Sequence, residues 1–154
     1  MYQATSLAEL GSVALGRWEA RAAKKPERDV RRHLNDALGR YREALEMTPP
    51  NAVGQLAVIH NQLGGVYREA GDLDRVLHHC REAIRLEEAQ GNLYGAAVTR
   101  YNVAIALMEA SRLVDARQYA DAALRDYQTY GAGAADKVQK TLALIADIAK
   151  AATA

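Results

Sequence analysis

Several residue types are scarce in this chain, and each scarcity excludes a class of protein. A single cysteine, Cys80, excludes an internal disulfide framework. No apolar run approaches the ~18 residues of a membrane-spanning helix, and the formal net charge is only +1, so neither a membrane nor nucleic acid is favoured as a partner. The first residues, MYQATSLAEL, lack a basic region followed by an apolar one, which argues against a secretory signal and favours the cytoplasm.

Phenylalanine is absent and only three prolines occur among 154 residues, whereas alanine, leucine, arginine and glutamate are abundant. This composition favours helix. Apolar residues between Leu73 and Ile84 recur at the i, i+3, i+4, i+7 spacing of one helix face, and no segment alternates with period two for long enough to form a strand. We therefore predict seven helices, at about residues 5–23, 27–47, 51–70, 73–90, 93–110, 113–130 and 133–151.

Turn-forming residues separate these predicted helices. Pro49-Pro50 must end one helix, and Asn51 could cap the next. Gly71, Gly91 and Gly131 suit the position just beyond a helix end, where glycine readily adopts a left-handed backbone. Near the N-terminus, Ser6 with Glu9 resembles a capping box.

The second half of the chain repeats itself with a period of 40 residues. Residues 57–91 align with residues 97–131, with conservative matches between the identities. A third copy lies upstream at a shift of 39, where Arg42-Glu43-Ala44 aligns with Arg81-Glu82-Ala83. The identical pairs of the 40-residue shift are Ala57 and Ala97, Val58 and Val98, Glu69 and Glu109, Ala70 and Ala110, Leu73 and Leu113, Ala83 and Ala123, Arg85 and Arg125, and Gly91 and Gly131.

Two short motifs within these repeats resemble the tetratricopeptide repeat family. Leu63-Gly64-x2-Tyr67 matches the first half of that family's pattern, and Ala37-x3-Tyr41 followed by Pro49 matches the second half. His60 replaces the family's tryptophan and Cys80 its aromatic residue. The 40-residue period is similar to the extended repeats of kinesin light chain-like proteins, bacterial peptide-sensing regulators and bacterial signalling ATPases.

The resemblance implies an all-α, right-handed solenoid. We expect one domain over residues 1–154, built from three helix hairpins at about 5–48, 51–91 and 93–131 and a C-terminal capping helix at 133–151. In that family the first helix of each pair lines a concave groove where ligands bind. The implied function is therefore a non-enzymatic scaffold that binds a peptide or protein segment, as the sensor or regulatory arm of a larger bacterial signalling protein.

Transfer of that geometry places an apolar stripe and a polar stripe in the groove. The apolar stripe contains Tyr101, Ile105 and Met108, while Asn61, Arg68 and Asn102 could hydrogen-bond a peptide main chain. Gly65 would flatten the groove and let a ligand backbone come close. The predicted binding residues are Asn61, Gly65, Arg68, Tyr101, Asn102, Ile105 and Met108.

Two other uses of the surface stay open. In the last predicted helix, Val138, Thr141, Ile145 and Ile148 form a second apolar stripe, which together with the 93–110 stripe could form a homodimer or pack within the fold. Basic residues gather between Arg17 and Arg32, where a solvated face is the simpler interpretation than nucleic-acid binding.

No pattern of residues predicts a catalytic, cofactor or metal site. Adjacent residues on a helix point about 100° apart, so His78-His79-Cys80 is poorly arranged to hold one metal ion. The LGGVYREAG stretch from Leu63 lacks the Lys-Ser/Thr end of a phosphate-binding loop. Cys80 is expected to be a small core residue because a tyrosine occupies its place in the upstream copy.

Overall fold

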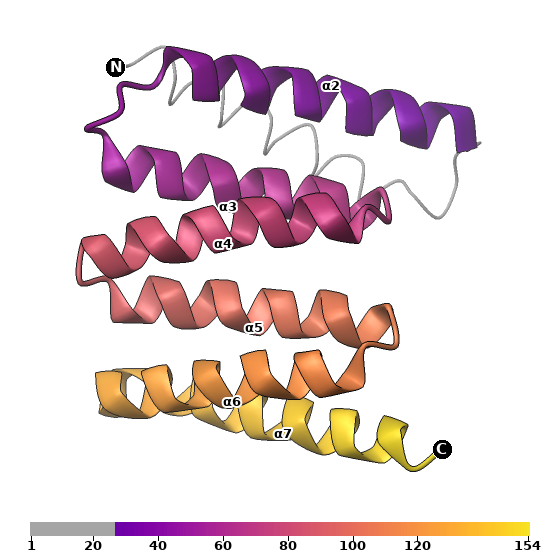
Figure 1. The fold of residues 1–154 in the computed structure, drawn as a ribbon, viewed down its shortest axis with the longest axis vertical. Coiled ribbons are helices and arrows are strands. Elements are labelled where there is room, and N and C mark those ends of the chain that lie inside the picture. The colour runs from indigo at the N-terminus through magenta and orange to yellow at the C-terminus, as the bar shows by residue number, and fades with distance from the viewer. Residues whose placement is uncertain (1–26) are drawn as a thin grey trace. The chain divides into compact units, whose positions relative to one another are not determined.

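The computed structural model describes residues 27–154, and all of the elements in this range are helical. The predicted helix at 5–23 and the Ser6–Glu9 capping box lie outside these residues. Six α-helices and one short 3-10 helix follow one another along the chain (Figure 1). They are α2 (Glu27–Met47), α3 (Val53–Glu69), α4 (Leu73–Ala89), α5 (Leu93–Glu109), α6 (Leu113–Tyr130), η2 (Ala132–Ala134) and α7 (Ala135–Ala152).

The six helices predicted from residue 27 onward match these bounds to within a few residues. The predicted cap at Asn51 is wrong, because α3 begins at Val53 and Ala52 precedes it without a side-chain cap. The amide of Ala52 bonds to the carbonyl of Pro49 at 3.0 Å, so a backbone turn rather than a side chain starts this helix. Neighbouring helices pack in pairs, namely α2 with α3, α5 with α6, and α6 with α7.

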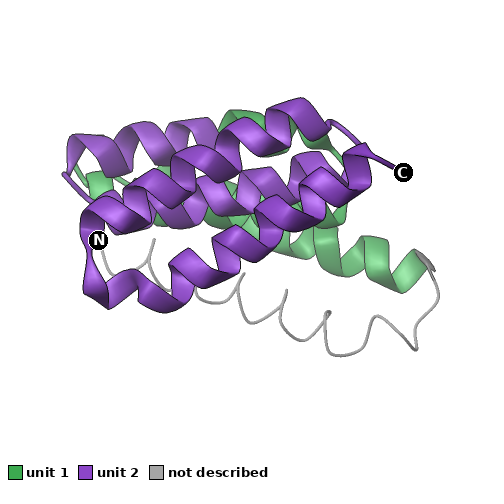
Figure 2. Ribbon diagram, turned by 90° about the horizontal axis from the view of Figure 1, so that it is seen from below, with its two compact units in different colours: residues 1–79 green, residues 80–154 purple. Residues whose placement is uncertain are grey.

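The helices fall into two compact units that divide within α4 (Figure 2). The first ends at His79 and the second runs from Cys80 to Ala154. In the first unit, α2 packs against α3. The residues of α2 in the buried core include Ala37, Tyr41 and Ala44, all fully buried. Small residues let two helices approach closely while an aromatic ring fills the space beside them, as the sequence motif predicts.

The core of the second unit follows the same rule. Its buried cluster contains three alanines with no exposed surface, Ala97, Ala123 and Ala134, together with Tyr127. Four half-buried apolar side chains pack around this cluster: Tyr94, Val98, Tyr101 and Val138. Small side chains from α5, α6 and η2 thus pack together in this core, with Tyr127 filling the space beside them.

The 40-residue period of the sequence is also the period of the helices. Moving α3 by 40 residues gives the bounds of α5, and moving the start of α4 by 40 gives the start of α6. The burial pattern recurs with it, since Ala57, Leu63 and Val66 are buried and so are their counterparts 40 residues on. The structure therefore confirms the repeat within residues 53–130.

Three connections, at residues 70–72, 90–92 and 110–112, have the same backbone design. In each, the amide of the middle residue bonds to the carbonyl three residues before it, and the amide of the last residue bonds five residues back. This is the Schellman ending of a helix, in which the middle residue has a left-handed conformation. Gly71 and Gly91 take that position with φ of 75° and 68°, as predicted, and Ser111 takes it with φ of 60°.

Candidate peptide-binding pocket

A small pocket opens in the second unit where α5, α6 and α7 meet. Its volume is about 100 Å³. Its lining combines an apolar wall with hydroxyl, amide and ammonium groups: Val98, Tyr101, Asn102, Tyr127, Lys137, Lys140 and Thr141. We refer to this feature as the α5–α7 pocket.

Tyr127 forms the buried wall of the α5–α7 pocket. The residue is only 1% exposed, and the ring of Tyr94 packs edge-on against it, with ring centres 5.6 Å apart. Burial, followed by the nearby Tyr94 and Tyr101, raises the pKa of the Tyr127 hydroxyl to about 12. The hydroxyl therefore stays protonated at neutral pH and is able to donate a hydrogen bond to a ligand.

Most polar groups of the pocket have no partner within the described part of the chain. The hydroxyl of Thr141 is occupied, because it donates to the carbonyl of Lys137 at 2.7 Å. The side chains of the other five polar lining residues form no hydrogen bond and no ion pair with any described residue: Tyr101, Asn102, Tyr127, Lys137 and Lys140.

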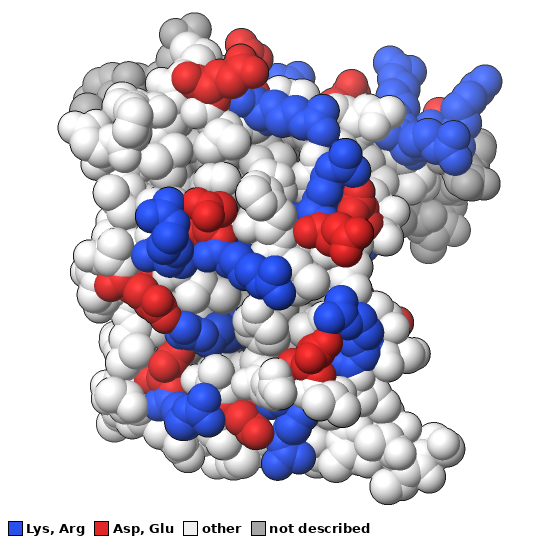
Figure 3. Space-filling view, in the orientation of Figure 1, with Lys and Arg blue, Asp and Glu red and all other residues white. Residues whose placement is uncertain are grey.

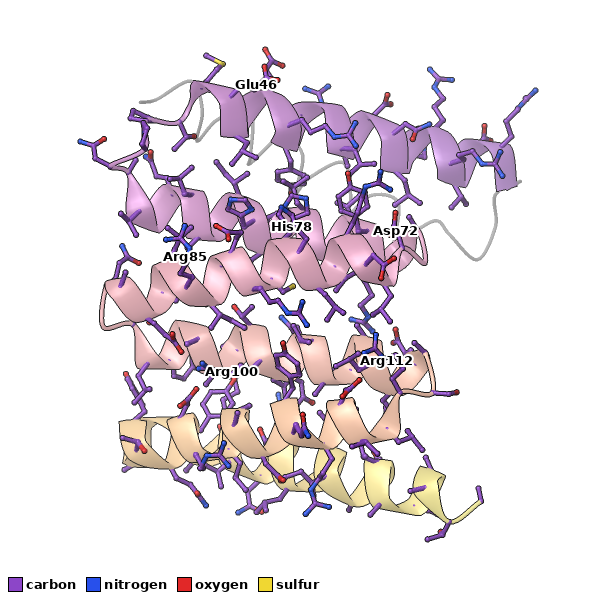
Figure 4. All side chains as sticks on the ribbon, viewed as in Figure 1. Glu46, Asp72, His78, Arg85, Arg100 and Arg112 are labelled. Atoms are coloured by element: carbon purple, nitrogen blue, oxygen red, sulfur yellow. The ribbon has the colours of Figure 1, made fainter. Side chains whose placement is uncertain are left out.

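The arginines elsewhere in this unit are different, because many pair with a carboxylate. Arg100 on α5 bonds to Asp126 at 2.5 Å and also contacts Glu88. Arg112 and Arg117 pair with acids one turn along α6. Figure 3 shows the resulting mixture of positive and negative side chains on one face, and Figure 4 shows where Arg100 lies on α5 and where Arg112 lies just before α6.

The structure places two of the predicted binding residues in the α5–α7 pocket, Tyr101 and Asn102. Ile105 and Met108 lie further along α5, half-buried, and do not line it. Asn61, Gly65 and Arg68 lie on α3 in the first unit, also half-buried, and form a separate group. Tyr127, Lys137 and Lys140 were not among the binding residues predicted from the sequence. The spacing of the two lysines, one turn apart on a predicted helix, was the signal that could have found them.

Gly65 is not required by packing. No atom lies within 4 Å of the place where a side-chain Cβ would stand, and the backbone there is ordinary helix. Glycine inside a helix is less favourable than alanine by roughly 1 kcal/mol. Nothing within the fold therefore requires glycine at this position, and its place in a ligand groove stays a prediction.

The apolar stripe predicted for the last helix is largely covered. Thr141 and Ile148 are buried and Val138 packs on the alanine cluster of the second unit. The opposite side of α7 is exposed, and Leu142 keeps 43% of its surface accessible. The stripe is therefore buried mainly by packing of α7 on α6 and α5 within one chain, rather than left free for a homodimer.

A histidine cluster in the first unit was not predicted. The Nδ1 atoms of His60 on α3 and His79 on α4 are 3.0 Å apart. The ring of Tyr67 stacks on His79 with an interplanar angle of 3°, and Arg42 donates to the Tyr67 hydroxyl at 2.7 Å. His78 meets His79 edge-on. His78 and His79 are neighbours in the sequence, but the approach of His60 to His79 depends on how α3 packs on α4.

Within residues 27–154, no group of three or more histidine, cysteine, aspartate or glutamate side chains is arranged so that it could hold a metal ion. Cys80 is buried, as predicted, and burial raises the pKa of its thiol to about 12, with a smaller contribution from Glu87. A thiol with such a pKa stays protonated and is a poor nucleophile or metal ligand.

Searches of protein-family models, curated proteins and solved structures find no match to this chain. The resemblance to tetratricopeptide repeats therefore stays a prediction based on the motifs. None of the helices described here is long and apolar enough to cross a membrane.

Proposed function

We propose that this chain is a non-enzymatic module that binds a peptide or protein segment, and that the α5–α7 pocket is part of its binding surface. The supporting observation is the combination of an apolar wall with unpartnered polar groups. A peptide presents apolar side chains together with main-chain donors and acceptors, so a site for it needs both kinds of contact. As such a module, the chain would serve as the sensor or regulatory arm of a larger bacterial signalling protein.

Tyr101 and Asn102 would have different roles in this binding. The ring of Tyr101 offers a rigid apolar surface with a polar tip, which suits an anchor contact. The exposed amide of Asn102 is able to donate to and accept from the main chain of a segment. Ile105 and Met108 continue the apolar surface along α5 at helical spacing from Tyr101.

Selection of random peptides displayed on phage tests this proposal. Peptides recovered on the immobilised protein would be synthesised with a fluorophore and titrated by fluorescence anisotropy. Anchor residues dominate affinity, so the double variant Tyr101→Ala with Asn102→Ala should raise Kd by about tenfold or more. The matched control is Val114→Ala, which removes an apolar group that is 75% exposed and does not line the pocket.

Two results would contradict the proposal. One is the failure to recover any peptide that binds the wild-type chain. The other is equal affinity of the double variant and the wild type, with the helical circular dichroism of both unchanged.

The rival proposal, assembly of copies of this chain through the stripes of α5 and α7, has weaker support. Thr141 and Ile148 of the α7 stripe are already buried. The α5 stripe of Tyr101, Ile105 and Met108 is half-buried, so it could contact either a bound peptide or a second copy of the chain.

A further inference from the structure

We propose that the α5–α7 pocket recognises a doubly charged phosphoryl group, carried as a phosphomonoester by the segment that the chain binds. This inference rests on the proposed peptide-binding function and specifies the chemistry of its ligand. It is argued from the charge, the hydrogen-bond donors and the size of the pocket.

The charge of the pocket is the first argument. Lys137 and Lys140 are one helical turn apart on α7, and both line the pocket. No carboxylate lines it, and neither ammonium group pairs with an acid among the described residues. Asp136, the acidic residue of the first turn of α7, is exposed and outside the lining.

Two neighbouring positive charges are best neutralised by a dianion. A phosphomonoester carries about −1.5 to −2 charges at pH 7, whereas a carboxylate carries only one. Like charges one turn apart on a helix repel each other, so a ligand that neutralises both removes this repulsion as well. Lys137 also lies in the first turn of α7, where the helix dipole favours an anion.

The donors of the pocket are the second argument. Tyr127 is 99% buried and its hydroxyl has no hydrogen-bond partner among the described residues, yet its side chain lines the pocket. With the hydroxyl of Tyr101 and the amide of Asn102, it adds three neutral donors to those of the two ammonium groups. A phosphoryl group has three strongly accepting oxygens and is able to use donors from several directions.

The size of the pocket is the third argument. A volume of about 100 Å³ has room for several water molecules and hence for a compact tetrahedral group. The pocket is open to solvent, so the remainder of a larger ligand would lie outside it. A short segment with one phosphorylated side chain satisfies that condition.

Three small aromatic probes isolate the charge of the ligand. Phenyl phosphate, benzoate and phenol present the same ring with a dianion, a monoanion and a hydroxyl group. We expect isothermal titration at low salt to show binding of phenyl phosphate, with benzoate at least about tenfold weaker and phenol weakest. Inorganic phosphate, the fourth probe, should bind less tightly than phenyl phosphate because it lacks the apolar part.

Variants locate the binding within the molecule. Lys137→Gln with Lys140→Gln should abolish phenyl phosphate binding, and Lys150→Gln is the matched control because Lys150 is exposed at the end of α7 and outside the pocket. Tyr127→Phe keeps the buried ring and removes only the hydroxyl, so it should weaken binding severalfold while the protein stays folded. Thermal unfolding of each variant checks that the fold is retained.

The outcomes separate this inference from the proposed function. Equal binding of benzoate and phenyl phosphate, or unchanged binding to the double lysine variant, overturns the phosphoryl assignment. If phage-selected peptides still bind and their phosphorylated versions bind no tighter, the peptide-binding function stands and this inference fails. If inorganic phosphate binds as tightly as phenyl phosphate and no peptide binds, the ligand is free phosphate, which overturns both the proposed function and the assignment to a segment.

Discussion

At the residue scale, Ser111 is in an unfavourable backbone conformation. It is the one non-glycine residue of the described chain with a positive φ, at 60°. Gly71 holds the same place 40 residues earlier, with the same pair of backbone hydrogen bonds around it. A left-handed conformation costs a residue with a side chain roughly 1–2 kcal/mol, and glycine adopts it freely.

Ser111→Gly should therefore stabilise the protein. We expect the free energy of unfolding to rise by about 0.5–1 kcal/mol, because the greater freedom of glycine in the unfolded chain offsets part of the relief. The reciprocal variant Gly71→Ser should lower it by a similar amount. Urea unfolding followed by circular dichroism measures both, and a destabilised Ser111→Gly would contradict this account.

At the element scale, the contact between α3 and α4 contains a proton-sensitive pair. His60 and His79 are able to share a hydrogen bond only while at least one of the two facing Nδ1 atoms lacks a proton. Burial, followed by the charges of His60, His78, Arg42 and Arg75, lowers the pKa of His79 to about 4. The unfolded chain, with an ordinary histidine pKa near 6.5, binds a proton at pH values where the folded protein does not.

This pair should make stability fall in mild acid. Because the folded pKa of His79 is the lower one, its contribution is complete above about pH 6.5 and is lost progressively as pH falls toward 4. The loss should be about 1–2 kcal/mol, since His79 is half-buried and solvent screens part of the effect.

His79→Tyr removes the titrating group and places there the residue found 40 positions later, at Tyr119. Urea unfolding at pH 7.5, 6.0 and 4.5 should show this variant gaining stability relative to the wild type as pH falls. His78→Gln, at an exposed position, is the control. If the difference in free energy of unfolding between wild type and His79→Tyr did not change with pH, this explanation would be wrong.

At the scale of the whole molecule, the exposed apolar side chains of residues 27–154 do not belong to a single helix. The large apolar side chains that remain exposed come from four different helices: Met47, Val58, Val114, Tyr130 and Leu142. A stable homodimer buries about 800 Å² per partner around a continuous apolar centre. We therefore expect sedimentation equilibrium to give the monomer mass at every loading concentration, and a mass that rises toward twice this value would favour self-association instead.

Some predictions for the whole chain are confirmed by the described residues, and others stay predictions. All-helical structure and pairing of adjacent helices are confirmed for residues 27–154. The seventh helix, the solenoid and the single domain stay predictions, because helix 5–23 lies outside the described residues and the two units are described separately.

The helices and their ends were determined by the sequence itself, because they depend on local rules. Apolar spacing defines each helix, and Gly71 and Gly91 end two of them in the way that glycine chemistry predicts. The 40-residue period also follows from the sequence, since equal helices and equal three-residue connections repeat together. The prediction of a cap at Asn51 is wrong, because a backbone turn from Pro49 to Ala52 precedes the helix instead.

Only the tertiary structure decided which side chains meet. Tyr101 and Asn102 are far in sequence from Lys137 and Lys140, and packing of α5, α6 and α7 around the buried alanine and tyrosine cluster brings them together. The contact of His60 with His79 likewise depends on the rotation of two helices about their axes. Helical periodicity gives the face of each helix, but the packing of neighbouring helices sets the angle between those faces, and contacts between distant residues follow from that angle.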